Sequence, residues 1–227
     1  MLELTDYGAL PDGSDCTPAL NAALTAAAAG PIRTIHVPAG QWSFLTSPIP
    51  FTASQRLVGE GYSVTQFIYG VSNGHFLVFQ GNGCGIKDIT LLAGAGTSGS
   101  VAIHCVASDA IGPGGVHIIE NVWVTSLVGA PWAIPIFLDG AARTVAPVGI
   151  RTVTLRNVTV FNAQYWAMEW WNTIACEWFG GGAYQGAGVT QNIVVGGALA
   201  TGNLIHANIP GLGTSTIWPG SLRSGVL

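Results

Sequence analysis

Carboxylates that lie near tryptophans are the residues of this sequence best suited to chemistry. The chain holds eleven Asp and Glu residues, and six of them fall in its N-terminal region or in turn motifs. Glu169 lies within YWAMEWW (residues 165–171), and Glu177 directly precedes Trp178. The five carboxylates outside the turns are Asp109, Glu120, Asp139, Glu169 and Glu177.

A pair of carboxyl groups about 5–9.5 Å apart can hydrolyse a glycosidic bond, one group as the acid and the other as nucleophile or base. Asp139 closes a strand-like segment one repeat before the segment that holds Glu169, so these two side chains could approach each other. We therefore nominate Glu169, Glu177 and Asp139 as candidate catalytic residues. The alternative is that a carboxylate beside Trp only accepts a hydrogen bond at a subunit interface.

Tryptophans are concentrated in the same part of the chain, because five of the eight lie between residues 132 and 178. Indole faces stack on sugar rings, so aromatic side chains near carboxylates are typical of glycan sites. The candidate glycan-binding residues are Trp166, Trp170, Trp171 and Trp178. Large aromatic residues also fill protein interiors and subunit interfaces, and this second interpretation stays open.

Other chemistry finds little support. The five histidines lack metal-ligand spacing, and His104 and Cys105, as strand neighbours, point to opposite faces. The four widely spaced cysteines are predicted to be buried thiols. We therefore expect no metal and no cofactor.

The elements that position these residues repeat along the chain. Residues 86–91 (IKDITL), 119–124 (IENVWV) and 155–160 (LRNVTV) share one pattern at offsets of 33 and 36. Such a period predicts a coil in which each repeat makes one circuit and stacks on the previous one. Asp88, Asn121 and Asn157 recur at one position of the repeat, where we expect them to hydrogen-bond turn backbone.

The N-terminal 30 residues differ from the rest. Turn chemistry in residues 6–15 precedes a predicted helix with Thr17 as N-cap, Pro18 first in the helix, and an Ala-rich run that Gly30-Pro31 ends. The predicted organisation is an N-terminal cap (1–31), a β-helix (32–210) and a C-terminal tail (211–227).

Three N-terminal motifs, DYGALPDGSDCTPALNAAL (6–24), IHVPAGQW (35–42) and LVGEG (57–61), resemble the opening of the pectate-lyase-like β-helix family, which includes phage tailspikes. The resemblance implies an all-β, single-stranded right-handed parallel β-helix with a short capping α-helix, usually assembled as a homotrimer. The catalytic patterns of polygalacturonase-type relatives are absent, since Asn172-Thr173 is followed by Ile174 instead of Asp. The fold itself does not decide the chemistry.

Composition limits the partners. Only 8% of residues are charged, 49% are hydrophobic and the mean hydropathy is +0.47, which favours a surface buried against other subunits. A net charge of −4 without a basic patch argues against nucleic acid. No apolar stretch of 18 residues and no export signal is found, so we expect neither membrane insertion nor secretion.

Three functional hypotheses follow. The first is a trimeric phage tailspike or tail-fibre protein, assembled in the host cytoplasm, that joins other virion proteins and attaches to a host surface polysaccharide. The second is a polysaccharide depolymerase, either a glycoside hydrolase or a lyase. The third is a purely structural decoration or adaptor protein of the virion.

Overall fold

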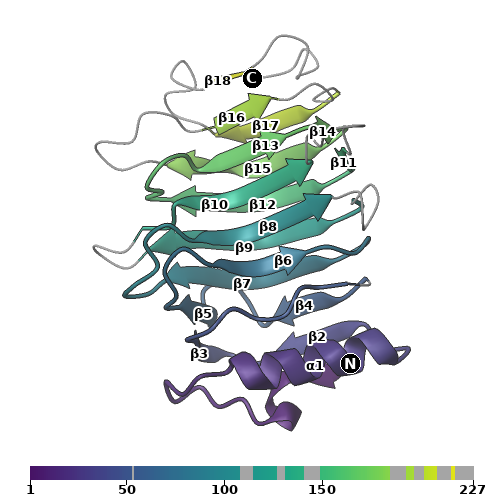
Figure 1. Cartoon of the computed structure of the whole chain (residues 1–227), viewed down its shortest axis with the longest axis vertical. Coiled ribbons are helices and arrows are strands. Elements are labelled where there is room, and N and C mark those ends of the chain that lie inside the picture. The colour runs from purple at the N-terminus through teal and green to yellow at the C-terminus, as the bar shows by residue number, and fades with distance from the viewer. Residues whose placement is uncertain are drawn as a thin grey trace.

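A long coil of parallel strands makes up the described part of the chain (Figure 1). The computed structural model describes residues 1–52, 54–107, 115–126, 131–140, 149–184, 193–196, 202–208 and 216–217. Every ladder between the described strands is parallel. The prediction of stacked circuits, as opposed to hairpins, is confirmed, and the architecture is a parallel β-helix.

Two large sheets form the walls of this coil. Sheet A joins, in spatial order, β1 (Leu2–Glu3), β2 (Thr34–Val37), β4 (Arg56–Gly59), β7 (Gly85–Ala93), β9 (Ile118–Ser126), β12 (Thr154–Phe161), β15 (Glu177–Tyr184) and β17 (Leu204–Asn208), and it also contains β3 (Gly40–Phe44) and β5 (Thr65–Tyr69). Sheet B joins β6 (His75–Phe79), β8 (Val101–Ala107), β10 (Ile134–Gly140), β13 (Met168–Trp171), β16 (Ile193–Gly196) and β18 (Thr216–Ile217). The short strands β11 (Ile150–Arg151) and β14 (Thr173–Ile174) pair with each other.

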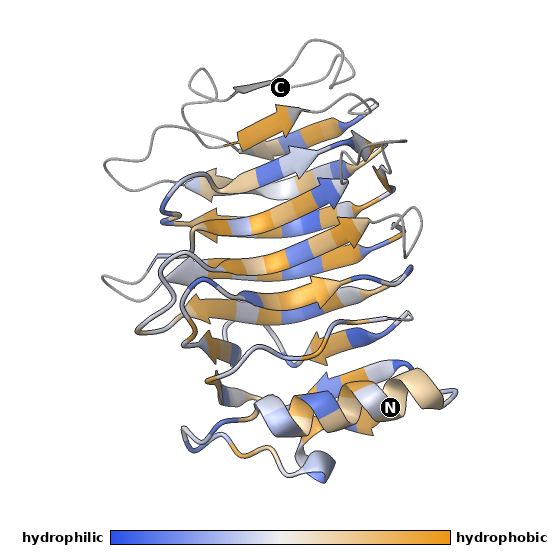
Figure 2. Ribbon diagram, viewed as in Figure 1, coloured by the Kyte–Doolittle hydropathy of each residue, from blue (hydrophilic) through white to orange (hydrophobic). Residues whose placement is uncertain are grey.

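The sequence repeats stack in register. Ile86 pairs with Ile119, and Ile119 pairs with Leu155, so the first residues of the three repeats form one buried column. Side chains alternate across each strand, and the left-handed residue at the third position of the repeat shifts this alternation, so Ile86 and Ile89 both point into the coil. Figure 2 shows the result as hydrophobic strands interrupted by hydrophilic positions.

Asp88, Asn121 and Asn157 form a ladder along sheet A. All three adopt left-handed backbone conformations, with φ of 57°, 51° and 50°. The Asn121 amide donates to Asp88 Oδ1 (2.9 Å), and the Asn157 amide donates to Asn121 Oδ1 (3.1 Å). Like residues lie directly above one another, so their side chains hydrogen-bond to each other. The prediction that they bond to turn backbone is thereby corrected.

The N-terminal helix α1 (Thr17–Ala29) lies against the first coil, next to the 3-10 helix η1 (Leu4–Tyr7) (Figure 1). It buries Leu20 and Leu24. The helix begins one residue earlier than predicted, and Asp15 Oδ1 accepts hydrogen bonds from the Thr17 N–H (3.0 Å) and hydroxyl (2.6 Å). No helix in the part of the chain described is long and apolar enough to cross a membrane.

The interior is apolar and aromatic, and it also holds the cysteines. All four cysteines are buried and free, as predicted. Burial raises the pKa of the Cys84 thiol to about 11 and that of Cys176 to about 12, so both stay protonated near neutral pH. The predicted C-terminal tail (211–227) lies outside the described residues, apart from β18.

His117 is a titratable residue in the apolar interior. It is fully buried, and neither ring nitrogen has a hydrogen-bond partner. Burial lowers its pKa from the usual 6.5 to about 4, although the nearby Cys84 backbone acts in the opposite direction. Between these two values the unfolded chain holds a proton at His117 that the folded chain does not, so the free energy of unfolding rises with pH across this interval.

We expect the free energy of unfolding to fall by up to about 3 kcal/mol as the pH is lowered from about 6.5 to about 4. In His117→Leu this part of the pH dependence should disappear, because no group remains there to take up the proton. Urea unfolding at several pH values measures it, with His206→Leu on the surface of sheet A as the control. Equal pH dependence in His117→Leu and the parent chain would contradict the assignment.

Candidate functional site

Outward-facing residues of sheet B bring two of the nominated carboxylates together. Phe137 of β10 pairs with Glu169 of β13, and Asp139 pairs with Trp171. Leu138 and Trp170, between them, point into the coil and are buried. Asp139 and Glu169 therefore lie on one face, on adjacent coils and two positions apart, as the sequence suggested.

Glu169 is partly buried beside an indole. The Trp166 Nε1–H donates a hydrogen bond to Glu169 Oε2 at 2.9 Å. Burial raises the pKa of the Glu169 carboxyl, and the negative charge of Asp139 acts in the same direction. The Trp166 hydrogen bond and His104 oppose this rise, but the net pKa stays above the usual value, which favours retention of a proton on this carboxyl.

Two histidines that sequence reasoning did not place here complete the cluster. The Nε2 of His104, on β8, lies 3.4 Å from the Oδ2 of Asp139. The His104 ring stacks on the Phe137 ring, with the two centroids 4.8 Å apart and an angle of 1° between the ring planes. Its Nδ1 lies 2.6 Å from the Nδ1 of His75, at the start of β6. Burial lowers the pKa of His75, and His104 lowers it further, whereas Asp139 raises it.

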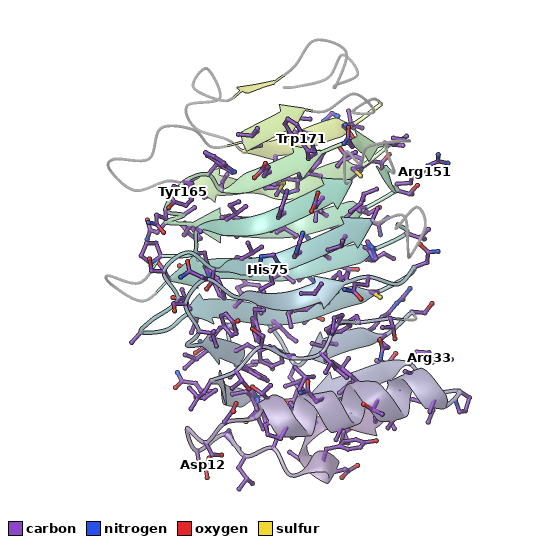
Figure 3. All side chains as sticks on the ribbon, in the orientation of Figure 1. Asp12, Arg33, His75, Arg151, Tyr165 and Trp171 are labelled. Atoms are coloured by element: carbon purple, nitrogen blue, oxygen red, sulfur yellow. The ribbon has the colours of Figure 1, made fainter. Side chains whose placement is uncertain are left out.

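The signal that could have identified the histidines is their spacing. His75, His104 and Asp139 are 29 and 35 residues apart, which is close to the repeat length. Figure 3 shows His75 and Trp171 on the same sheet, with His75 nearer the N-terminal end of the stack. Metal-ligand motifs place their residues only a few positions apart, so they do not reveal side chains that lie one coil apart.

Three nominated residues do not join this site. Glu177 lies on β15 of sheet A, paired with Thr154, so it belongs to a different wall of the coil. Trp170 and Trp178 have no exposed surface. The predicted role of Trp170 and Trp178 in glycan binding is therefore wrong, because a side chain inside the coil cannot stack on a sugar.

The other tryptophans and carboxylates singled out in the sequence differ in their surroundings. Trp166 and Trp171 stay partly exposed beside the carboxylates. Glu120 forms an ion pair with Lys87 on sheet A (3.0 Å), and Asp109 lies outside the described residues. Across the described ranges, no three His, Cys, Asp or Glu side chains converge as metal ligands.

Comparison with known proteins identifies the fold. No protein-family model matches the chain, and no curated protein matches it. The Agl-KA catalytic domain aligns with a TM-score of 0.61 and 15% identity over 99% of this chain and 46% of its own length. The A-module of the mannuronan C-5 epimerase AlgE6 from Azotobacter vinelandii aligns with a TM-score of 0.53 and 16% identity, over 92% of this chain and 68% of its own.

The chain shares the parallel β-helix fold of the Agl-KA catalytic domain and the AlgE6 A-module. ORF18 of Geobacillus virus E2 aligns at a TM-score of 0.42 and 11% identity, over 92% of this chain and 62% of that one, which is too distant to carry an argument. At identities this low the comparisons establish the fold alone, and the chemistry has to be argued from the site.

Two substitutions should move the pKa of Glu169 in opposite directions. Trp166→Phe should raise it, because the indole N–H stabilises the ionised carboxylate, and Asp139→Asn should lower it, because a neighbouring negative charge is removed. A pH titration of the Glu169 carboxyl carbon by ¹³C NMR measures both changes. Shifts in the same direction for both variants would show that the two side chains do not act on Glu169 as the geometry indicates.

Proposed function

We propose that the outer face of sheet B binds a polysaccharide and that Glu169 and Asp139 hydrolyse its glycosidic bonds. The observation that carries this proposal is the placement of the two carboxylates on adjacent coils of one face, with Trp166 and Trp171 beside them. Partly exposed indoles can stack on sugar rings, and carboxylates accept hydrogen bonds from sugar hydroxyls. Sheet B also extends over successive coils, which suits a long polymer.

The two carboxyl groups have different environments, and this difference assigns their roles. Glu169, with its raised pKa, is the group that holds a proton for the departing glycosidic oxygen. Asp139, next to His104, acts as the nucleophile or as the base that activates water. One carboxyl therefore gives a proton while the other supplies negative charge or takes a proton.

The neighbours are consistent with this proposal without deciding it. AlgE6 is a mannuronan C-5 epimerase, so the fold accommodates a polysaccharide enzyme. The chain spans less than half of the Agl-KA catalytic domain.

Removal of the acid should abolish cleavage. We expect Glu169→Gln to lower the rate at which new reducing ends appear by about a hundredfold or more, which is the usual contribution of a general acid. Glu177→Gln, on sheet A, is the matched control and should keep the parent rate. The substrates are purified neutral and acidic bacterial polysaccharides.

Three outcomes distinguish the hypotheses. Loss of cleavage in Glu169→Gln, with the parent rate kept in Glu177→Gln, supports hydrolysis on sheet B. Binding of a polysaccharide without cleavage favours an attachment protein. If no polysaccharide in the set binds, the proposal fails and a purely structural protein is favoured.

We further propose that the chain works as a trimeric, right-handed, tailspike-type β-helix within a virion, with α1 as its cap. The supporting feature is an aromatic column on sheet A. Tyr62 stacks on Trp123 (centroids 4.8 Å apart), Trp123 meets Phe161 edge-on (5.8 Å), and Phe161 stacks on Tyr184 (5.1 Å). Tyr62 and Trp123 are also exposed, and aromatic residues are enriched at protein interfaces, so the column suits contact with a second copy.

Trp123 is 39% exposed, so a charge placed there should block association. We expect a trimer for the parent chain and a smaller species for Trp123→Glu, measured by sedimentation equilibrium. Leu45→Glu, at another exposed apolar residue, is the control and should keep the parent mass. A parent chain that sediments as a stable monomer rules out the trimer.

A further inference from the structure

Three polar side chains from three successive coils of sheet B lie in a row. His75, His104 and Asp139 come from β6, β8 and β10, and two contacts join them: Nδ1 to Nδ1 at 2.6 Å and Nε2 to Oδ2 at 3.4 Å. His104 is only 7% exposed, and its ring is held parallel to Phe137. The middle member of the row therefore has a defined orientation.

The direction of these hydrogen bonds follows from where protons can reside. An ionised carboxylate only accepts, so the Nε2 of His104 must carry the proton that faces Asp139. A neutral imidazole has one N–H, which leaves the Nδ1 of His104 as an acceptor. The Nδ1 of His75 must then donate to it, and the lone pair of a neutral His75 lies on Nε2.

We propose that Asp139 and His104 form a hydrogen-bond relay that presents the Nε2 of His75 as an acceptor for a ligand hydroxyl group. His75 is the exposed member of the row, so it can reach a ligand while His104 cannot. This inference rests on the proposed function, since the hydroxyl belongs to a bound sugar. His75 is then a binding residue, and His104 is a positioning residue.

Two observations support the role of His75. Although His75 has exposed surface, its ring is partly buried; this partial burial and His104 lower its pKa, so the ring stays neutral near pH 7. The neighbouring strands β6, β8, β10 and β13 carry His75, His104, Asp139 and Glu169 in order, and three inter-strand spacings make about 14 Å. His75 thus extends the carboxylate site toward the N-terminal coils, which lengthens the surface that a polymer can contact.

The ring protons can be tested without any ligand. In the full-length protein at neutral pH, ¹⁵N NMR of the imidazoles should show His104 protonated at Nε2 and His75 protonated at Nδ1. Asp139→Ala should abolish the preference at His104, because the acceptor that selects the proton position is gone. His104 protonated at Nδ1 in the parent chain, or unchanged by Asp139→Ala, would overturn the relay whether or not a polysaccharide binds.

The ligand contact is tested by affinity for a polysaccharide that the parent chain binds. His75→Phe keeps an aromatic ring but removes the acceptor, and it should weaken binding about fivefold, the contribution of one ordinary hydrogen bond. His104→Phe should weaken binding to a similar extent and shift the His75 proton position, since the ring remains on Phe137 but the relay is broken. His206→Phe, on sheet A, is the control and should bind normally.

The outcomes separate this inference from the proposed function. If Glu169→Gln and Trp171→Ala lower affinity while His75→Phe does not, the sheet B face binds polysaccharide and the His75 contact is wrong. If the proton positions are as expected but none of the tested polysaccharides binds, the ligand role fails together with the proposed function. Parallel losses in His75→Phe and His104→Phe, with the expected proton positions, support the inference.

Discussion

The register between successive coils is the constraint on which every other feature depends. Parallel backbone ladders place each residue directly above its counterpart in the previous coil, about 4.8 Å away. A slip of one residue would exchange the inner and outer faces of a strand. The buried columns of aliphatic and aromatic side chains resist such a slip, because it would expose them and bury their polar neighbours. The Asp88–Asn121–Asn157 ladder adds a polar bond that also depends on alignment.

The same register builds the candidate site. Residues some 30 positions apart in sequence become neighbours, so a row of single polar residues on separate strands becomes a cluster. The Phe137 ring stacks on His104 and the Trp166 N–H donates a hydrogen bond to Glu169, and these contacts orient the functional groups. Partial burial then changes their protonation, raising the pKa of Glu169 and lowering that of His75, because each charged form loses contact with water.

The two sheets use aromatic residues differently. On sheet B, indoles lie beside carboxylates and one of them donates a hydrogen bond to Glu169. On sheet A, the rings stack mainly on one another along the coil axis. A partly exposed indole beside carboxylates suits contact with a sugar, whereas exposed aromatic residues in a column suit a protein interface. With only 8% of residues charged, these surfaces are defined by ring orientation more than by net charge.

The sequence alone determined the coil, because its like segments at offsets of 33 and 36 can bury their aliphatic positions only by stacking. It also indicated that Asp139 and Glu169 could approach each other, since Asp139 closes the segment equivalent to the one that holds Glu169. It could not decide which aromatic residues face outward. In residues 165–171 the odd-numbered and the even-numbered positions both include aromatic residues, so hydrophobicity does not reveal which side of the strand is buried. Only the tertiary structure placed Trp170 and Trp178 inside, moved Glu177 to the other sheet, and joined His75 to His104. The physical reason is that those outcomes depend on the phase of each strand and on the path of the turns, and local sequence preferences specify neither.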